Sequence, residues 1–428
     1  MILVEFFEKD AIENICSSLV SAPEKVIFIG PNKKLMAAHA AKYEGVLSDR
    51  GVNTEFSVKA VGKNNLQSII DVLSALVEEN TECVFDLTGG DELYLTALGV
   101  VYERYKSTGK IKLHRFSVAS NTIIDCDQDG STISSGRAPQ LSVEENIRIY
   151  GGDIVYNKSG RAKTTARYEM TDSLRSDING IWSVCRTGSR FWNAFTAVIG
   201  EAAHLGAKGE LSASINAEAF DKICRKNGIG YDLIRKLFNE LSANGLILLF
   251  TSDDTSVSFT FKNELIKQCL TVAGKALEMK VFAAASDAYE DDGSKTYNDV
   301  MTGVVIDWDG ELHPEPGNTN EYDTENEIDV MMMHGMVPVF VSCKNGGTDA
   351  DELYKLQSVA ARFGGKYAKK VLIATSLDDS DKSNYIRQRA EDMEIRLIEG
   401  HRQNGSFKKF TGMNDRDMNR VIRSLWIN

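Results

Sequence analysis

The stretch NEIDVMMMHGMVPVFVSCKN, residues 326–345, predicts two apolar strands joined by a tight turn. We predict His334 and Gly335 as the two turn residues, because glycine tolerates the positive φ that such turns require. The apolar composition of both strands predicts a buried hairpin.

Polar side chains interrupt this apolar hairpin. With that turn, Asp329 lies opposite Phe340 and diagonal to Ser342, since side chains alternate between the two faces of a strand. Lys344 shares the face of Ser342, and Glu327 shares the face of Asp329 nearer the strand start. These charged side chains are either strand-end groups that reach solvent or members of a functional surface. The hairpin alone does not distinguish the two.

Helix and strand patterns surround the hairpin in a predicted unit over 264–428. We expect one long helix over 264–289, which contains Glu278, and a strand over 302–308. After the hairpin we expect a helix over 351–370 and then strands over 370–376 and 395–400. This order predicts an α/β unit with a mixed sheet.

The first predicted unit, 1–145, alternates short apolar strands with amphipathic helices. Such alternation predicts a parallel sheet covered on both faces, as in a Rossmann-like domain. Ligands bind such sheets beyond the carboxyl ends of the strands, and two loops there have suitable chemistry. The candidate ligand-binding residues in them are Gly30, Pro31, Asn32, Lys33 and the adjacent Lys34, then Thr88, Gly89, Gly90, Asp91 and Glu92.

Glycines in these loops let backbone N–H groups approach an anion, and the following helix adds a partial positive charge. A GxGxxG motif is absent from the sequence, which disfavours a nicotinamide or flavin dinucleotide. The alternative is that both loops are ordinary turns, with Asp91 and Glu92 capping a helix.

The segment 146–263 is predicted as a connector followed by a winged-helix-like spacer. Amphipathic helices over 217–228 and 231–245 precede a strand pair over 246–263. Arg235 and Lys236 would be placed to read DNA, but Asp232 and Glu240 balance them, which favours a dimerising spacer.

Composition excludes several classes of protein. The 428 residues carry a net charge of −12, which argues against a non-specific duplex-DNA coat. Seven cysteines without a CxxC motif argue against a disulfide framework or a structural zinc site. The sequence MILVEFFEKD at residues 1–10 predicts a strand and not a signal peptide, and no apolar run is long enough for a membrane span. We therefore expect a cytoplasmic protein.

The basic run at 401–428 is a candidate for a local nucleic-acid groove, although most such runs are solvated helix faces.

The C-terminal unit resembles the PD-(D/E)xK nuclease superfamily. Asp329 matches its first acid, Lys344 its lysine and Glu278 the glutamate that an N-terminal helix often supplies. Ser342 stands where the second acid belongs, and Ile328 where the proline would be. The resemblance implies catalytic roles for Glu278, Asp329 and Lys344. It also implies a Mg²⁺ or Mn²⁺ ion held by Glu278, Asp329 and the main-chain carbonyl of Cys343, while Glu327 lies nearer the strand start.

The N-terminal unit resembles the CRISPR-associated Rossmann-fold sensors, called CARF domains, through DLTGG at 86–90 and GPNKK at 30–34. The order of units looks like that of the CRISPR-associated nucleases that cyclic tetra-adenylate activates. The resemblance implies a homodimer whose two-fold axis passes through the cyclic ligand, and cleavage of single-stranded DNA or RNA in type III antiviral defence.

Two rival functions stay open at this point. One is a ligand-responsive transcription regulator, in which the winged helix binds DNA and the last unit is a degenerate nuclease. The other gives the N-terminal unit an activity that degrades its own activator.

Overall fold

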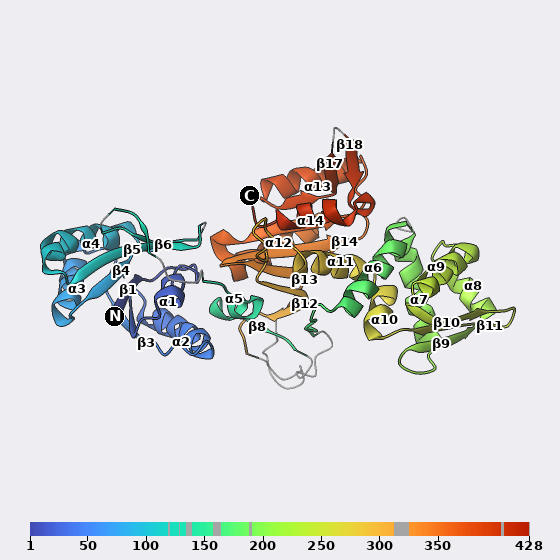
Figure 1. The fold of residues 1–428 in the computed structure, drawn as a ribbon, viewed down its shortest axis with the longest axis horizontal. Helices are drawn as coiled ribbons and strands as arrows, with labels where there is room; N and C mark the ends of the chain where they lie inside the picture. The colour runs from blue at the N-terminus through green and yellow to red at the C-terminus, as the bar shows by residue number, and fades with distance from the viewer. Residues whose placement is uncertain are drawn as a thin grey trace.

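The computed structural model describes residues 1–118, 120–127, 129–133, 139–156, 164–187, 191–311, 325–403 and 406–427. Figure 1 shows three units in a row, with the C-terminal unit lying between the N-terminal unit and the middle segment. Residues 312–324, which precede the predicted hairpin, lie outside the described residues. No described helix is both long and apolar enough to cross a bilayer.

The N-terminal sheet has the strand order β3-β2-β1-β4-β5-β6-β7, and its first five strands are parallel. The strands are β1 (Ile2–Phe6), β2 (Lys25–Gly30), β3 (Glu55–Ala60), β4 (Cys83–Asp86), β5 (Ile111–Ser117), β6 (Thr122–Asp125) and β7 (Thr132–Ile133). The parallel core confirms the predicted alternation, and β1 confirms the predicted first strand. The antiparallel strands β6 and β7 correct the prediction of a wholly parallel sheet. Strand β6 begins five residues after the end of β5, which is too close in sequence for a crossover helix, and it pairs antiparallel with β5.

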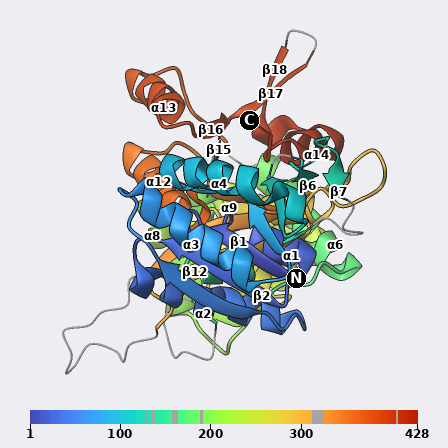
Figure 2. The same cartoon turned by 90° about the vertical axis from the view of Figure 1, so that its left-hand side faces the viewer.

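Helices cover both faces of this sheet (Figure 2). They are α1 (Cys16–Ser21), α2 (Lys33–Asp49), α3 (Leu66–Glu79) and α4 (Glu92–Tyr105), with η1 (Lys106–Thr108) after α4. The apolar stripes of α3 and α4 pack together on one face, and those of α1 and α2 pack on the other. Asn32 caps α2 and Asp91 caps α4, each accepting a backbone N–H of the first turn. Both helices therefore begin directly after the loops predicted to bind ligand.

The middle segment combines helices with a three-stranded antiparallel sheet in the order β10-β11-β9. Its elements are α6 (Asp172–Thr187), α7 (Trp192–Leu205), β9 (Ser212–Asn216), α8 (Ala217–Lys226), α9 (Tyr231–Ala243), β10 (Ile247–Ser252) and β11 (Ser256–Phe261). The two predicted helices and the predicted strand pair are all present. Strand β9 was not predicted, because its sequence SASIN is short and mostly polar.

The C-terminal sheet has six strands in the order β16-β15-β14-β13-β12-β8. The strands are β8 (Asp153–Ile154), β12 (Asp299–Asp307), β13 (Glu325–His334), β14 (Val337–Lys344), β15 (Lys369–Ala374) and β16 (Arg396–Ile398). The accompanying elements are α5 (Val143–Ile149), α10 (Glu264–Thr271), α11 (Lys275–Ser286), α12 (Ala350–Gly364), η3 (Gly365–Tyr367), α13 (Asp381–Asp392), β17 (Gly400–Gln403), β18 (Ser406–Lys409), η4 (Phe410–Gly412) and α14 (Asp415–Arg423). The sheet is mixed, as predicted, and β8 from the predicted connector forms its edge.

Two details of the prediction are wrong. The helix expected over 264–289 is broken between α10 and α11, where Gly274 adopts φ +91°. An L-residue rarely adopts that conformation, so the glycine allows the chain to restart the helix in a new direction. The hairpin turn consists of Gly335 and Met336, because His334 pairs with Val337. Met331 therefore lies opposite Phe340, and Asp329 lies beside Ser342 instead of Phe340.

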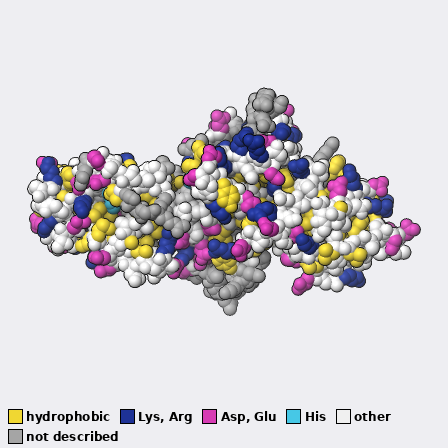
Figure 3. Space-filling model, in the orientation of Figure 1, with side chains coloured by type: hydrophobic (Ala, Val, Ile, Leu, Met, Phe, Trp, Pro, Cys, Tyr) yellow, Lys and Arg dark blue, Asp and Glu magenta, His cyan; other side chains and the backbone are white. Residues whose placement is uncertain are grey.

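The two faces of the C-terminal sheet belong to different apolar cores. Val330 and Val341 pack with α11, while Met331 and Phe340 pack with α12. Because side chains alternate, Asp329, Ser342 and Lys344 all stand on the α12 face. Lys and Arg side chains gather on the upper surface of this unit, over α13, α14 and the β17-β18 hairpin (Figure 3).

Candidate active site

A cavity of about 560 Å³ opens where β13 begins, β14 ends, and α11 and α12 start. All the residues that the sequence predicted for the catalytic and metal-binding site line it. They are Glu278, Asp329, Cys343 and Lys344, together with Glu327, Ile328 and Ser342. The structure thus brings together residues that are far apart in the sequence, from helix α11 and strands β13 and β14.

Glu278 enters the cavity from the first turn of α11. The residue is only 8% exposed, and its Oε2 pairs with Lys275 Nζ at 2.9 Å. A Cβ on Gly274 would lie 3.6 Å from Glu278 Oε1 and 3.9 Å from the carbonyl oxygen of Cys343. The glycine therefore leaves open the space that these two oxygens face, which a larger side chain would fill.

Asp329 is fixed by the hairpin itself. Its Oδ2 accepts the backbone N–H of Cys343 at 2.6 Å and the hydroxyl of Ser342 at 3.2 Å. The Ser342 hydroxyl lies 2.8 Å from Glu352 Oε1 as well. A hydroxyl carries a single proton, so Ser342 links two acidic side chains and fully satisfies only one of them.

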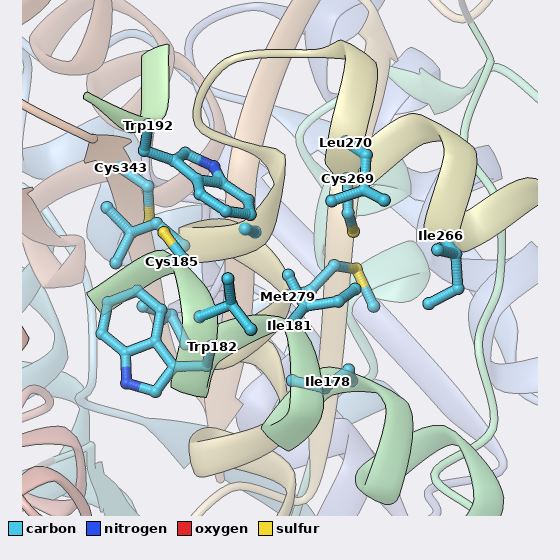
Figure 4. Close-up of a cluster of buried hydrophobic side chains, with 14 of the residues drawn as sticks. Ile178, Ile181, Trp182, Cys185, Trp192, Ile266, Cys269, Leu270, Met279 and Cys343 are labelled. Atoms are coloured by element: carbon cyan, nitrogen blue, oxygen red, sulfur yellow. The ribbon is translucent and has the colours of Figure 1, made fainter. Parts of the chain in front are cut away.

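Cys343 alternates to the opposite face, where its side chain enters an apolar cluster. Figure 4 shows it beside Trp192 and Cys185, which come from α7 and α6. Burial of this thiol anchors the end of β14, so its N–H stays on Asp329 and its carbonyl stays near Glu278. The middle segment therefore helps to hold the strand end that carries the site.

The surroundings of Glu278 and Asp329 disfavour the state in which both carboxylates are ionised. Burial, with contributions from Asp329 and Glu327, raises the pKa of Glu278 from 4.5 to about 7, although Lys275 opposes the rise. Burial also raises the pKa of Asp329, and Lys344 and the N–H of Cys343 only partly offset it. A cation bound between these two acids would stabilise their ionised forms, so the pair suits a metal site.

Lys344 stays protonated in this setting. Burial alone would lower its pKa, but the charges of Asp329 and Glu352 outweigh burial and raise it. Its Nζ lies 3.0 Å from Glu352 Oε2. At neutral pH the side chain is therefore an ammonium group, suited to stabilising negative charge and to orienting a water, and not to acting as a general base.

Sequence reasoning missed Glu352 and Asn193, which line the cavity, and Lys275, which pairs with Glu278. Glu352 stands in the first turn of α12, Lys275 in the first turn of α11, and Asn193 donates to the carbonyl of Asn345 at 2.7 Å. The sequence signal that could have indicated Glu352 is its place at the start of the helix that follows Lys344. For Lys275, the signal is a positive charge three residues before Glu278, a spacing at which two side chains of a helix can pair.

The donor set fits a hard divalent cation. Carboxylate and carbonyl oxygens are the ligands that Mg²⁺ and Mn²⁺ prefer. Across the described ranges, no three His, Cys, Asp or Glu side chains already meet in ligand geometry. The predicted set uses two carboxylates and one main-chain carbonyl, so it does not require such a triple.

The two predicted ligand loops of the N-terminal unit lie on the same edge of its sheet, because β2 and β4 flank β1. Lys33 and Lys34 are exposed there, while Thr88 is partly buried and accepts the N–H of Phe116 at 2.7 Å. The loop after β1, which was not predicted, lies between them. Its Glu8 accepts the N–H of Gly90 at 2.8 Å, and a Cβ on Gly89 would collide with Glu8 at 2.5 Å.

Two side chains of the basic run at 401–428 form ion pairs with acids of the same chain. Lys408 lies 3.4 Å from Asp417, and Arg423 lies 2.7 Å from Asp291. Arg416 and Arg420 are exposed on α14 and line a second cavity of about 560 Å³. The side chain of Arg402 lies outside the described part of the chain.

Residues 272–417 match the family model described as Card1-like, endonuclease domain. Protein VC1899 from Vibrio cholerae has a similar fold, with a TM-score of 0.71 and 19% identity over 93% of this chain and 93% of that one. Can2 from Sulfobacillus thermosulfidooxidans, solved in complex with cyclic tetra-adenylate, has a TM-score of 0.61 and 15% identity over 99% of this chain and 97% of that one. No curated protein is significantly similar in sequence.

Proposed function

On the premise that residues 272–417 form a Card1-like endonuclease domain, we propose that the chain is a divalent-metal-dependent endonuclease that cyclic tetra-adenylate activates. It cleaves single-stranded DNA, RNA or both in type III CRISPR antiviral defence. The observation that carries the proposal is that Glu278, Asp329 and Lys344 line one cavity inside the matched residues.

In this mechanism Glu278, Asp329 and the carbonyl of Cys343 would hold Mg²⁺ or Mn²⁺. Such an ion would supply Lewis-acid polarisation of the scissile phosphate and make the attacking water more acidic. Lys344 orients that water and offsets the charge that grows on the phosphate oxygens. Lys275 holds one oxygen of the Glu278 carboxylate, and Ser342 donates to Asp329.

The activator site lies at the carboxyl edge of the N-terminal sheet. Lys33 and Lys34 pair with phosphates, while Asn32, Thr88 and the amides near Gly89 and Gly90 bond the nucleotides. Support comes from the exposure of both lysines, and from the Can2 structure, which has a similar fold and contains this ligand. Glu8 holds the Gly90 amide in this structure, so binding through that amide requires Glu8 to move.

A cyclic tetranucleotide has two-fold symmetry, so we propose a homodimer in which each N-terminal unit supplies the same loops. The division into a sensor (1–145), a winged-helix-like spacer (146–263) and a nuclease (264–428) belongs to this proposal. Within the spacer, α8 and α9 followed by the β10-β11 pair give the helix, helix and wing order.

The proposal predicts cleavage that needs both a metal and the activator. Purified protein should cut labelled single strands in Mn²⁺ only after cyclic tetra-adenylate is added, by at least about tenfold over the basal rate. The assay compares single-stranded DNA, single-stranded RNA and duplex DNA, with and without EDTA. Tight duplex binding without turnover would instead select the regulator. Linear fragments of the cyclic nucleotide would reveal an activator-degrading activity.

A continuous set of contacts links the two sites. Asn14 accepts the N–H of Glu8 at 2.8 Å and donates to its carbonyl, also at 2.8 Å. Glu13 lies beside Asn14 in the segment that follows β1. It accepts a hydrogen bond from the Tyr367 hydroxyl at 2.8 Å and pairs with Lys366 Nζ at 2.7 Å. Lys366 and Tyr367 lie in η3, directly after α12, whose other end reaches the cavity. Helix α12 thus spans from the sensor loop to the candidate active site.

Breaking that contact should uncouple activation from binding. For Glu13→Ala we expect the ratio of stimulated to basal cleavage to fall at least about fivefold, because coupling energies are typically 1–3 kcal/mol. The affinity for cyclic tetra-adenylate, measured by calorimetry, should change far less than this ratio. Glu82→Ala is the matched control, since Glu82 pairs with Lys112 at 3.0 Å on the exposed surface of the same unit. An unchanged ratio in Glu13→Ala would exclude this route.

A further inference from the structure

The site lacks an acid at the position where its strand motif normally carries one, and Ser342 stands there. We infer that Glu352, ten residues later on α12, supplies the acidic group that position 342 lacks. The inference rests on the proposed metal-dependent function and adds a residue to it. It explains how a chain with a hydroxyl in the motif keeps a complete set of charges.

The placement of Glu352 follows from the strand alternation. Asp329, Ser342 and Lys344 stand on the sheet face that α12 covers, whereas Glu278 arrives from α11 on the opposite face. An acid on the first turn of α12 can therefore reach the position of the missing side chain. Leu353 and Leu356 are buried against the sheet and fix the rotation of the helix, which turns Glu352 towards the strand end.

Each oxygen of Glu352 has its own contact. Oε2 lies 3.0 Å from Lys344 Nζ, and Oε1 lies 2.8 Å from Ser342 Oγ, which in turn lies 3.2 Å from Asp329 Oδ2. The carboxylate thus fixes the lysine on one side and adds negative charge beside Asp329 on the other, and this charge contributes to the raised pKa of Asp329.

Helix capping does not account for this side chain. Asp349 is the N-cap of α12, and its side chain accepts the N–H of Glu352. Asp351 already provides an exposed negative charge at the same helix start. Glu352 instead holds its carboxylate inside the cavity, with the side chain only 19% exposed.

Relocating the carboxylate tests the inference. An aspartate at 342 would bring a carboxylate to within bonding distance of where Glu352 now places its own, because Ser342 Oγ and Glu352 Oε1 are 2.8 Å apart. Glu352→Ala should weaken Mn²⁺ binding by about tenfold to a hundredfold, measured by electron paramagnetic resonance of free Mn²⁺, and lower cleavage with it. Ser342→Asp alone should also impair the site, since two carboxylates would crowd one space. The double variant Ser342→Asp/Glu352→Ala should recover at least tenfold over Glu352→Ala in Mn²⁺ affinity.

Asp351→Asn is the matched control, because it removes an acid from the same helical turn but not from the cavity. It should bind Mn²⁺ as the unaltered protein does. Glu352→Ala protein that is folded by circular dichroism and matches this control would overturn the inference, as would a double variant no better than Glu352→Ala. If the unaltered protein binds Mn²⁺ but cuts nothing, the proposed function fails while the affinity comparison still judges Glu352.

Discussion

Asp329→Asn is expected to remove metal- and activator-dependent cleavage, with a loss of roughly a thousandfold or more, since a catalytic metal contributes several kcal/mol to the transition state. The asparagine oxygen can still accept the N–H of Cys343, which the aspartate now binds at 2.6 Å. Only the negative charge and one ligand oxygen are lost. The fold of the hairpin should therefore survive, and the defect should lie in metal binding and chemistry.

The measurement is the initial rate of cutting at saturating Mn²⁺ and cyclic tetra-adenylate. Without metal, Asp329→Asn should melt no lower than the unaltered protein, because burial already raises the pKa of Asp329 and opposes its ionisation. Lys344→Ala should lose cleavage as well, but by losing charge stabilisation and not the ion. Asp381→Asn, an exposed acid at the start of α13, is the control with full activity. Full cleavage by Asp329→Asn would refute the assignment of this cavity.

Local patterns in the sequence were enough to predict the central strands of the two large sheets and several of the helices, but not β6 to β9. The alternation in 1–120 predicted the parallel core of the N-terminal sheet, and the apolar runs in 326–345 predicted the β13-β14 hairpin of the C-terminal sheet. The exact turn was not predictable, because His334-Gly335 and Gly335-Met336 both provide a glycine for a two-residue turn. The two choices differ by two residues in register, so Asp329 and Ser342 keep the same face in either case.

The missing members of the site depend on tertiary packing. Nothing local in the sequence shows that α12 packs on the face that carries Ser342, so Glu352 could not be distinguished from other acids at helix starts. The break at Gly274 had a local signal in the glycine, but an apolar pattern on both sides favoured one continuous helix. Residues that act through long-range contacts are visible only once the sheet order is known.

Glu278→Gln is expected to abolish cutting and at the same time to stabilise the metal-free protein, in a manner that depends on pH. The pKa of Glu278 is raised from 4.5 to about 7, first by burial and then by Asp329 and Glu327, against the opposing charge of Lys275. A carboxyl with a higher pKa in the folded state binds its proton more tightly there. The stability that this proton contributes is present below about pH 4.5 and is lost as the pH rises through about 7.

The difference between the two pKa values corresponds to about 3 kcal/mol of unfolding free energy. Glutamine keeps the neutral form at every pH, so Glu278→Gln should exceed the unaltered protein by about 3 kcal/mol at pH 8 and by less than about 1 kcal/mol at pH 5. The measurement is urea unfolding with EDTA at both pH values, read on the transition that Mn²⁺ shifts. Mn²⁺ should stabilise the unaltered protein more at pH 8 than at pH 6, because the ion and the proton compete for one carboxylate.

Glu264→Gln is the control for this experiment, since Glu264 is an exposed acid on the neighbouring helix α10 and pairs with Lys267 at 3.3 Å. It should change neither the pH dependence nor the response to Mn²⁺. If Glu278→Gln were less stable than the unaltered protein at pH 8, the ion pair with Lys275 would outweigh burial, and the carboxylate would be held for stability. A gain in stability together with a loss of Mn²⁺ response and of cutting would show that the fold keeps an unfavourable buried charge for the metal.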